Sequence, residues 1–220
     1  LSGDAMMRYS YQLLENGGPA VLPDSCRICN HTSRKVCEGQ QYDMDFESRE
    51  HVSVEDYIKR ISLKTAILLA GATVIGAIVG GASKDDCTKL DSFATQLGIA
   101  FQIQDDILDS YGPLDTLGKN IGGDITAGKK TFLTTTALEI ADKDTRARLA
   151  GLLHNKEMIG EQKISEVLCI YDKLGVRAIA EEAVAEYTAA AIRSLESLSV
   201  PADRIVPMRH IANELTKRIS

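Results

Sequence analysis

One short segment of the chain, residues 101–109, sets three carboxylates at helical spacing among apolar residues. It reads FQIQDDILD. At about 100° per residue, its polar side chains fall within an arc of roughly 100° on a helix surface. They are Gln102, Asp105, Asp106 and Asp109. Anions this close repel one another and need a compensating cation, and carboxylate oxygens suit hard divalent metals such as Mg2+. The segment therefore predicts a magnesium site, and such a site suits a phosphate ligand.

A solvated acidic face is the alternative interpretation, and short acidic motifs usually have that origin. A solvated face should also be polar at its neighbouring positions. Residues 97–103 instead carry no charged side chain, and an uncompensated charge is costly in apolar surroundings. The flanking residues therefore favour the metal site.

Two further segments carry polar side chains that suit the same chemistry. Gln40 and Asp43 lie three residues apart in the run EGQQYDMD and so share a helix face. Lys64 and Thr65 stand at the start of a long uncharged stretch. A lysine there either extends to the surface or binds an anion inside the protein. The inward carboxylates predicted elsewhere favour anion binding.

The segment 111–130 is rich in glycine and carries lysines at positions 119, 129 and 130. Because it follows the aspartate helix, it is placed to fold over a phosphate and cover it. Residues 123–129 also match most of the phosphate-binding pattern GxxxxGK followed by Ser or Thr. The match fails because Lys130 replaces the hydroxyl residue and no apolar strand precedes the first glycine. A nucleotide-hydrolysing P-loop fold is therefore disfavoured.

Length and composition fit one ordinary globular domain. The chain has 220 residues, a mass of 23.9 kDa and a net charge of -6, which argues against a nucleic-acid partner. Five cysteines without a disulfide framework fit a reducing compartment, and we expect a cytoplasmic protein. Cys26 and Cys29, with His31 and Cys37 nearby, suggest a zinc site. Their spacing is tighter than that of a closed zinc site, so ordinary thiols are the favoured interpretation.

Apolar residues recur at helical spacing along nearly the whole chain, without sustained period-two alternation. Helices are expected at 4–15, 25–47, 53–81, 86–111, 129–141, 144–153, 161–174, 176–198 and 202–219. Ser83 offers a cap for the fourth helix, and Pro201 opens the last.

Residues 65–83 carry no charge and reach the lower limit for a membrane span. Their four glycines favour a central core helix instead, so we expect a single all-α domain over residues 1–220 and no membrane span.

Five segments together resemble the trans-isoprenyl diphosphate synthases, the family of the farnesyl and geranylgeranyl diphosphate synthases. They are LSGDAM, EGQQYDMDF, YIKRISLKTAILLAGA, FQIQDDILD and LGKNIGGDITAGKKT. Their combination, order and spacing are specific, whereas each alone is weak. The resemblance implies a helical bundle around a deep central cavity, normally in a homodimer. It also implies a head-to-tail condensation of an allylic diphosphate with isopentenyl diphosphate.

The resemblance further implies metal-binding roles. Asp105 would coordinate a Mg2+ that bridges to the allylic diphosphate, and Asp106 and Asp109 would support it. Asp43 is a further candidate metal ligand, and up to three Mg2+ would occupy the complete family site. Gln40 and Asp124 would belong to the supporting polar lining.

The same resemblance implies the substrate contacts. Lys64, Lys119 and Lys129 would hold diphosphate oxygens, and Thr65 and Gln102 would face the reacting carbon and stabilise the allylic cation. Lys64, Thr65 and Gln102 are therefore the candidate catalytic residues.

The sequence departs from the family pattern on its N-terminal side. The family has a first aspartate-rich motif before LSGD, and residues there that bind isopentenyl diphosphate, and this sequence contains neither. We therefore expect it to hold the C-terminal two-thirds of the family domain, and we expect a molecule beginning at Leu1 to be inactive. Two alternatives are a non-catalytic partner subunit of a prenyl diphosphate synthase, and a terpene cyclase, whose Asn/Ser/Glu metal motif is not found. Short products, of about fifteen to twenty carbons, are a guess from the resemblance.

Overall fold

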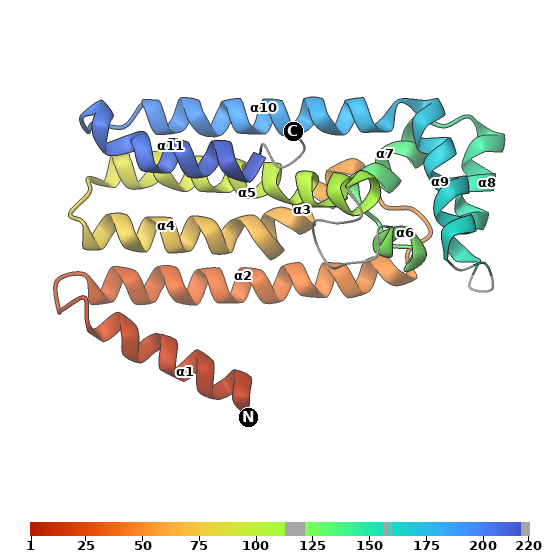
Figure 1. Cartoon of the computed structure of the whole chain (residues 1–220). Coiled ribbons are helices and arrows are strands. Elements are labelled where there is room, and N and C mark those ends of the chain that lie inside the picture. The colour runs from red at the N-terminus through yellow and green to blue at the C-terminus, as the bar shows by residue number, and fades with distance from the viewer. Residues whose placement is uncertain (113–121, 156–157, 159, 217–220) are drawn as a thin grey trace.

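The computed structural model describes residues 1–112, 122–155, 158 and 160–216 (Figure 1). These residues form helices and, within the described ranges, no strand, so the predicted all-α class is confirmed. In chain order the helices are α1 (Ser2–Glu15), α2 (Leu22–Ser48), α3 (Val54–Ile61), the π-helical turn η1 (Ser62–Ala66), α4 (Ile67–Val79), α5 (Lys84–Tyr111), α6 (Gly123–Thr126), α7 (Phe132–Ile140), α8 (Lys143–His154), α9 (Glu161–Leu174), α10 (Val176–Glu196) and α11 (Ala202–Thr216).

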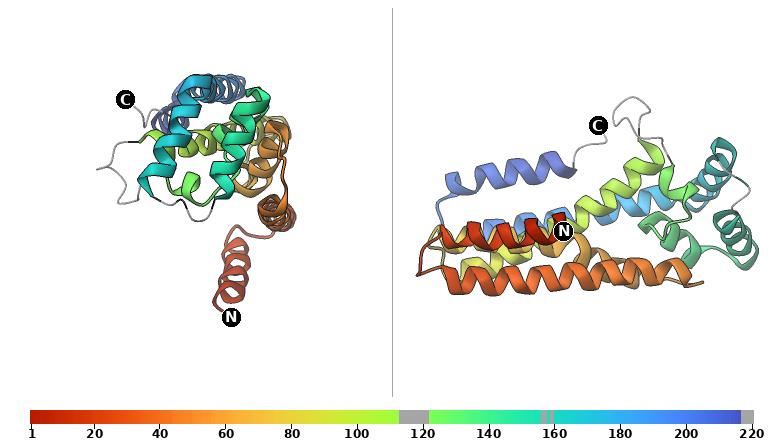
Figure 2. Two further views of the ribbon diagram at one scale, coloured as in Figure 1. Left: turned by 90° about the vertical axis from the view of Figure 1, so that its right-hand side faces the viewer. Right: turned by 90° about the horizontal axis from the view of Figure 1, so that it is seen from below.

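Four long helices lie side by side in the order α2, α4, α5 and α10 (Figure 1). The short helices α6 to α9 close one end of this bundle, beside the end of α5. Helix α11 packs on α10 and α5. Helix α1 packs against α2 and has no buried residue, and it stands apart from the bundle when viewed from the end (Figure 2).

Helix starts follow from side-chain caps. The hydroxyl of Ser53 accepts from the amide of Asp56, whose carboxylate accepts from the Ser53 amide, and this completes a capping box at α3. Ser83 caps α5 as predicted, because its hydroxyl accepts from the amide of Asp86. Thr131 caps α7 in the same way.

Helix α5 runs through the core. Ile103 and Ile107, on this helix, are fully buried with Tyr57, Leu133 and Tyr171 in the larger of two apolar clusters. The first half of α5 contributes to the second cluster, which packs beneath α10 and α11. The aspartate segment is therefore part of the central helix of the fold, and its neighbours are held rigidly by packing.

The helix expected at 53–81 is interrupted. It consists of α3, the π-helical turn η1 and α4. The apolar periodicity of the sequence did not predict the π turn. Residues Val54–Val79 are long and apolar enough to cross a membrane by length and composition alone, with a mean hydropathy of 1.9 in the most apolar window, of which 28% is buried. Ala70 is fully buried, as expected of a core helix, but Leu68 is 59% exposed. The prediction of a central core helix thus holds for one face only.

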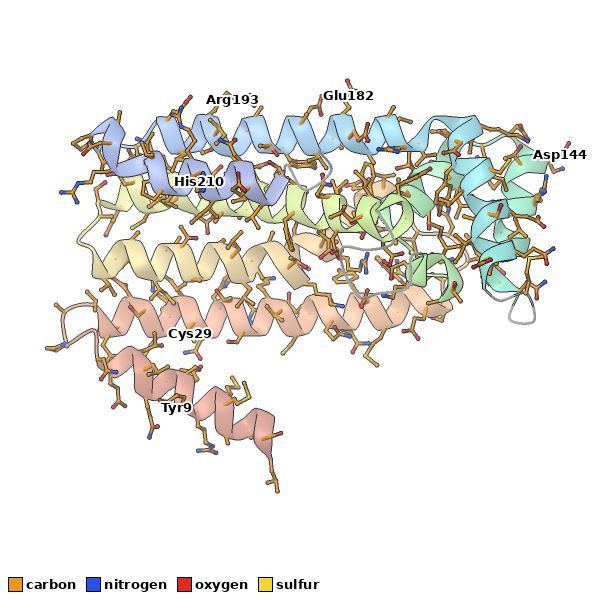
Figure 3. The ribbon with its side chains drawn as sticks, in the orientation of Figure 1. Tyr9, Cys29, Asp144, Glu182, Arg193 and His210 are labelled. Atoms are coloured by element: carbon orange, nitrogen blue, oxygen red, sulfur yellow. The ribbon has the colours of Figure 1, made fainter. Side chains whose placement is uncertain are left out.

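The cysteines that suggested the alternative zinc site lie on α2. All five cysteines are free thiols, and Cys29 lies on α2 near α1 (Figure 3). Within the described ranges, no three His, Cys, Asp or Glu side chains are grouped so as to hold a metal ion.

Candidate active site

The consecutive carboxylates of α5 lie in different environments. Asp105 is exposed, whereas Asp106 is only 4% exposed. One oxygen of Asp106, Oδ2, accepts from the hydroxyl of Tyr57 at 2.7 Å and from the amide of Phe132 at 2.8 Å. Burial raises the pKa of Asp106 to about 7, although these two hydrogen bonds favour its charged form. Asp106 therefore ties α5 to α3 and to the first turn of α7, a role that the sequence did not indicate.

Asp109 accepts two hydrogen bonds from backbone amides at the start of α6. Its Oδ2 accepts from the amide of Asp124 at 3.0 Å, and its backbone carbonyl accepts from the amide of Gly122 at 2.7 Å. Gly122 has a φ of 75°, a left-handed conformation that glycine adopts without strain. Burial raises the pKa of Asp109. The α5 helix thus fixes the turn that carries the next charged residues.

Helix α6 brings Lys129 to this carboxylate group. Lys129 Nζ lies 2.6 Å from Asp124 Oδ1, and this hydrogen bond raises the pKa of Lys129. Lys129 is exposed, so its ammonium is available to a ligand as well. Lys119, the other lysine predicted in this segment, lies outside the described residues.

The π-helical turn η1 presents Lys64 and Thr65 to α5. Thr65 Oγ1 donates to Gln102 Oε1 at 3.0 Å. The side-chain nitrogen of Gln102, Nε2, lies 3.5 Å from Asp105 Oδ2 and 3.4 Å from Asp106 Oδ1. Four of the predicted residues are therefore brought together in one network: Thr65, Gln102, Asp105 and Asp106.

Two glycines allow this turn to approach its neighbours closely. A Cβ atom on Gly39 of α2 would lie 2.5 Å from the backbone nitrogen of Lys64, and one on Gly98 of α5 would lie 2.6 Å from Ala66 Cα. Both distances are too short for any side chain. Single π turns inside α-helices are frequent at functional sites, and here the turn is packed between two helix backbones.

Asp43 is paired with protein cations. Its two oxygens accept from Arg60 and from Lys64. Burial would raise the pKa of Asp43, but the hydrogen bonds from Lys64 and Arg60 outweigh it and hold the pKa below its ordinary value. Asp43 thus orients Lys64, which differs from the metal-ligand role expected from the sequence. Gln40, on the same helix, is exposed.

Comparison with known proteins identifies the family. A family model described as polyprenyl synthetase matches residues 1–171. The chain belongs to the polyprenyl synthetase family. A short chain isoprenyl diphosphate synthase of Methanothermobacter thermautotrophicus is 34% identical over 199 residues, which cover 90% of this chain and 60% of that protein. The chain spans about half the length of the curated relatives it matches, from 41% to 60% among the first six.

Solved structures of family members have the same fold. The crystal structure of a geranylgeranyl pyrophosphate synthase superposes with a TM-score of 0.92 at 33% identity, covering 100% of this chain and 68% of that one. A polyprenyl synthase of Caulobacter crescentus, complexed with calcium and isoprenyl diphosphate, gives a TM-score of 0.80 at 26% identity, covering 90% of this chain and 60% of that one. The resemblance to trans-isoprenyl diphosphate synthases is thereby confirmed.

The oxygen chemistry of this polyprenyl synthetase site fits a hard divalent cation. Asp105 is exposed at the edge of the network and Asp109 is half-buried, so both can supply carboxylate oxygens. Since the described residues hold no preformed group of three acidic ligands, a bound Mg2+ would draw further oxygens from water and from a phosphate ligand. Mg2+ usually keeps such ligands in phosphate-binding enzymes.

Sequence reasoning missed one charged residue of the site, Arg60. It donates to Asp43, and its other nitrogen donates to the carbonyl of Lys130 at 3.2 Å. Its guanidinium also lies 5.1 Å from the ring centroid of Tyr57. Arg60 stands four residues before Lys64, and this spacing on one helix face was the available signal.

Proposed function

We propose that this chain forms the allylic-diphosphate-binding and ionising part of a trans-prenyltransferase. The reaction is the head-to-tail condensation of an allylic diphosphate with isopentenyl diphosphate, giving a short-chain isoprenyl diphosphate. The observation that carries this proposal is the joining of Thr65, Gln102 and Asp105 in one network, with Lys64 and Lys129 held beside it by Asp43 and Asp124. Relatives named as short-chain and geranylgeranyl diphosphate synthases support it.

The residues suit the departure of a diphosphate. Lys64 and Lys129 would bind its oxygens, and their carboxylate partners hold the two ammonium groups in place before a ligand arrives. Positive charge preorganised around a leaving group lowers the barrier, because it neutralises negative charge that grows in the transition state. Mg2+, when bound through Asp105 and Asp109, would supply further positive charge to the same oxygens.

The polar atoms beside the reacting carbon have defined orientations. Because Thr65 donates to the carbonyl oxygen of Gln102, its own hydroxyl oxygen keeps lone pairs that can face a carbocation. The allylic cation needs shelter from water, which an apolar wall around it would supply. Isopentenyl diphosphate would attack through its double bond, and the released diphosphate would accept the proton lost at the end.

In this proposal the protein is a cytoplasmic homodimer with no membrane span and no nucleic-acid partner.

Turnover by the natural gene product tests this proposal. We expect Mg2+-dependent elongation of geranyl or farnesyl diphosphate by isopentenyl diphosphate. Asp105→Asn should lower kcat by about 100-fold or more, the loss typical for a group that stabilises transition-state charge. Asp144→Asn changes an exposed aspartate of α8 (Figure 3) and should leave the rate within about twofold of the wild type, as for a surface substitution.

Equal rates in the two variants, or condensation without a divalent cation, would overturn the proposal. A rise in melting temperature with Mg2+ and diphosphate together, but no product, would favour the non-catalytic partner subunit. The molar mass in solution, measured by light scattering, tests whether the protein is the expected homodimer.

A further inference from the structure

A small cavity is lined by none of the residues of the Thr65 and Gln102 network. Its volume is about 160 Å3, and it lies between the α2–α3 connection, α7 and α8. Leucine and alanine side chains form its apolar walls. Its polar lining consists of Glu50, His51, Lys130, Arg146 and His154. The lining thus combines a lysine, an arginine and two imidazoles with one carboxylate around a small space.

Lys130 is the unusual member of this lining. It is only 9% exposed, and its ammonium makes no hydrogen bond or ion pair with any residue that the structure describes. Lysines are almost never this buried unless they are paired, because an unpaired buried charge is costly. Its backbone is fixed by the hydrogen bond from Arg60 to its carbonyl.

Lys163 shows what a satisfied buried lysine looks like in the same protein. It is 2% exposed, and its Nζ donates to the carbonyls of Thr126, Leu153 and Asn155 at 3.1 to 3.3 Å. Both residues are largely buried, but among the described residues only the ammonium of Lys163 has protein acceptors. Lys130 lines the cavity, so a ligand bound there can use its unpaired ammonium.

Arg146 and His154 line the same cavity as Lys130 and keep donors that a ligand can use. One nitrogen of Arg146 donates to the carbonyls of Glu139 and Ala141 at 3.2 and 3.1 Å. A guanidinium has five N–H donors, so others remain for a ligand. His154 Nδ1 lies 2.8 Å from the carbonyl of Ala150, which leaves its Nε2 for the cavity.

We propose that this cavity binds a small oxyanion between Lys130 and Arg146. Cations with unused donors recognise carboxylate or phosphate oxygens through charge-assisted hydrogen bonds. The cavity has room for about five waters at roughly 30 Å3 each, which admits a phosphate or a short carboxylate and excludes a prenyl chain. The site is separate from that of the proposed reaction, and Lys129, the sequence neighbour of Lys130, is paired with Asp124 instead.

The test uses the full chain without Mg2+ or prenyl diphosphates, so its result does not depend on turnover. Inorganic phosphate is titrated at constant ionic strength, followed by melting temperature and by calorimetry, with acetate as a second arm. We expect saturable binding of one anion per chain and a rise in melting temperature. Acetate binding at the same site would identify a carboxylate as the preferred ligand, and phosphate binding alone a tetrahedral anion.

Variants locate the anion. Lys130→Met keeps the length of the side chain and removes its charge, and it should lower the affinity for phosphate at least tenfold. Lys143→Met changes an exposed lysine of α8 and should bind as the wild type does. Unchanged binding in Lys130→Met, or no saturable binding by the wild type, would overturn the proposal. Loss of binding in Lys129→Met in place of Lys130→Met would also overturn it, since the anion would then lie in the active site.

A second variant keeps the test independent of folding. Arg146 is exposed, so Arg146→Gln should fold and should also weaken phosphate binding at least tenfold. Without phosphate, Lys130→Met should melt close to the wild type, because the Lys130 ammonium makes no hydrogen bond or ion pair with a described residue that the substitution could remove. Wild-type affinity in Arg146→Gln contradicts the shared site even if Lys130→Met fails to fold.

Discussion

Asp106 is the residue at which the candidate site and the core meet. Its carboxylate holds Tyr57 and the first amide of α7 through one oxygen, while Gln102 approaches the other. Asp105, one position earlier, is exposed to ligands. Asp106 thus stabilises the packing of the core, whereas Asp105 can contact a ligand. Substitutions at the two positions should therefore have different consequences.

Asp106→Asn should change how stability depends on pH. The pKa of Asp106 is about 7 in the folded protein, against an ordinary value of 3.8. Between these values the folded state keeps a proton that the unfolded state has lost, so stability falls as pH rises toward 7. The slope is at most about 1.4 kcal/mol per pH unit. Asparagine does not titrate, so the variant should lack this slope.

Urea unfolding of the metal-free protein across this pH range measures the effect. Asp144→Asn, on the surface of α8, serves as the control and should keep the slope of the wild type. Parallel curves for Asp106→Asn and the wild type would contradict a raised pKa at Asp106.

At the scale of the elements, the π-helical turn η1 sets the position of Lys64 and Thr65. It is packed against the backbone of α2 at Gly39 and against α5 at Gly98. An added Cβ at either glycine would displace the turn, because the atoms it meets are backbone or Ala66 and cannot rotate away. The position of the candidate catalytic side chains therefore depends on residues that carry no functional group.

Gly39→Ala should therefore impair the reaction and also destabilise the fold, because the backbone it meets must shift. A shift of about 1 Å at a reacting group can cost 100-fold in rate, so we expect kcat to fall at least tenfold. Gly76→Ala is the matched control in α4, where an added Cβ meets no atom within 4 Å. It should keep kcat and gain about 0.5–1 kcal/mol of stability, as alanine does over glycine within a helix. Equal kcat values in both variants would show that the turn tolerates displacement.

Lys163 joins three short elements, since its ammonium donates to the ends of α6 and α8 from α9. Lys163→Met would remove the ammonium that donates to the carbonyl of buried Leu153, and a buried acceptor that loses its donor costs about 1–3 kcal/mol. We expect a loss of at least this size in denaturant unfolding. Lys173→Met, at an exposed position of the same helix, should be nearly neutral. A neutral Lys163→Met would show that water replaces the ammonium.

The sequence predicted the helices well because their periodicity is local. The expected helix at 161–174 is found as Glu161–Leu174, and the one expected at 202–219 is found as Ala202–Thr216, with residues 217–219 lying outside the described ranges. The π turn was not predictable in this way, because Gly39 and Gly98 hold it from other helices. Helical spacing correctly grouped Gln102 with Asp105, but it does not say how deeply each side of the arc is buried. The isoleucines beside Asp106 were the one local indication of its burial.

At the scale of the whole molecule, the apolar segment from α3 to α4 is held by the bundle. Its first part carries ion-paired Arg60 and Lys64, and Gly71 of α4 packs directly on Thr32 of α2. Leaving the bundle for a bilayer would break these ion pairs and place charges in hydrocarbon, which costs several kcal/mol.

We therefore expect the protein to stay out of membranes. In a flotation gradient with neutral lipid vesicles, it should remain in the dense fraction. Leu68→Glu, on the exposed face of α4, should behave in the same way and keep its helical content. Flotation of the wild type and not of Leu68→Glu would instead indicate that the exposed face of α4 binds lipid.

The glycine contacts also have a mechanical consequence. Gly39, Gly71 and Gly98 lie on three different helices, and each one abuts a neighbouring backbone or a short side chain. Gly39 of α2 and Gly98 of α5 both contact the π turn, and Gly71 of α4 contacts α2, so these elements cannot slide past one another at these points without a collision. We expect them to move as a single block, with any widening that admits a ligand coming from α6 to α9 at the end of the bundle.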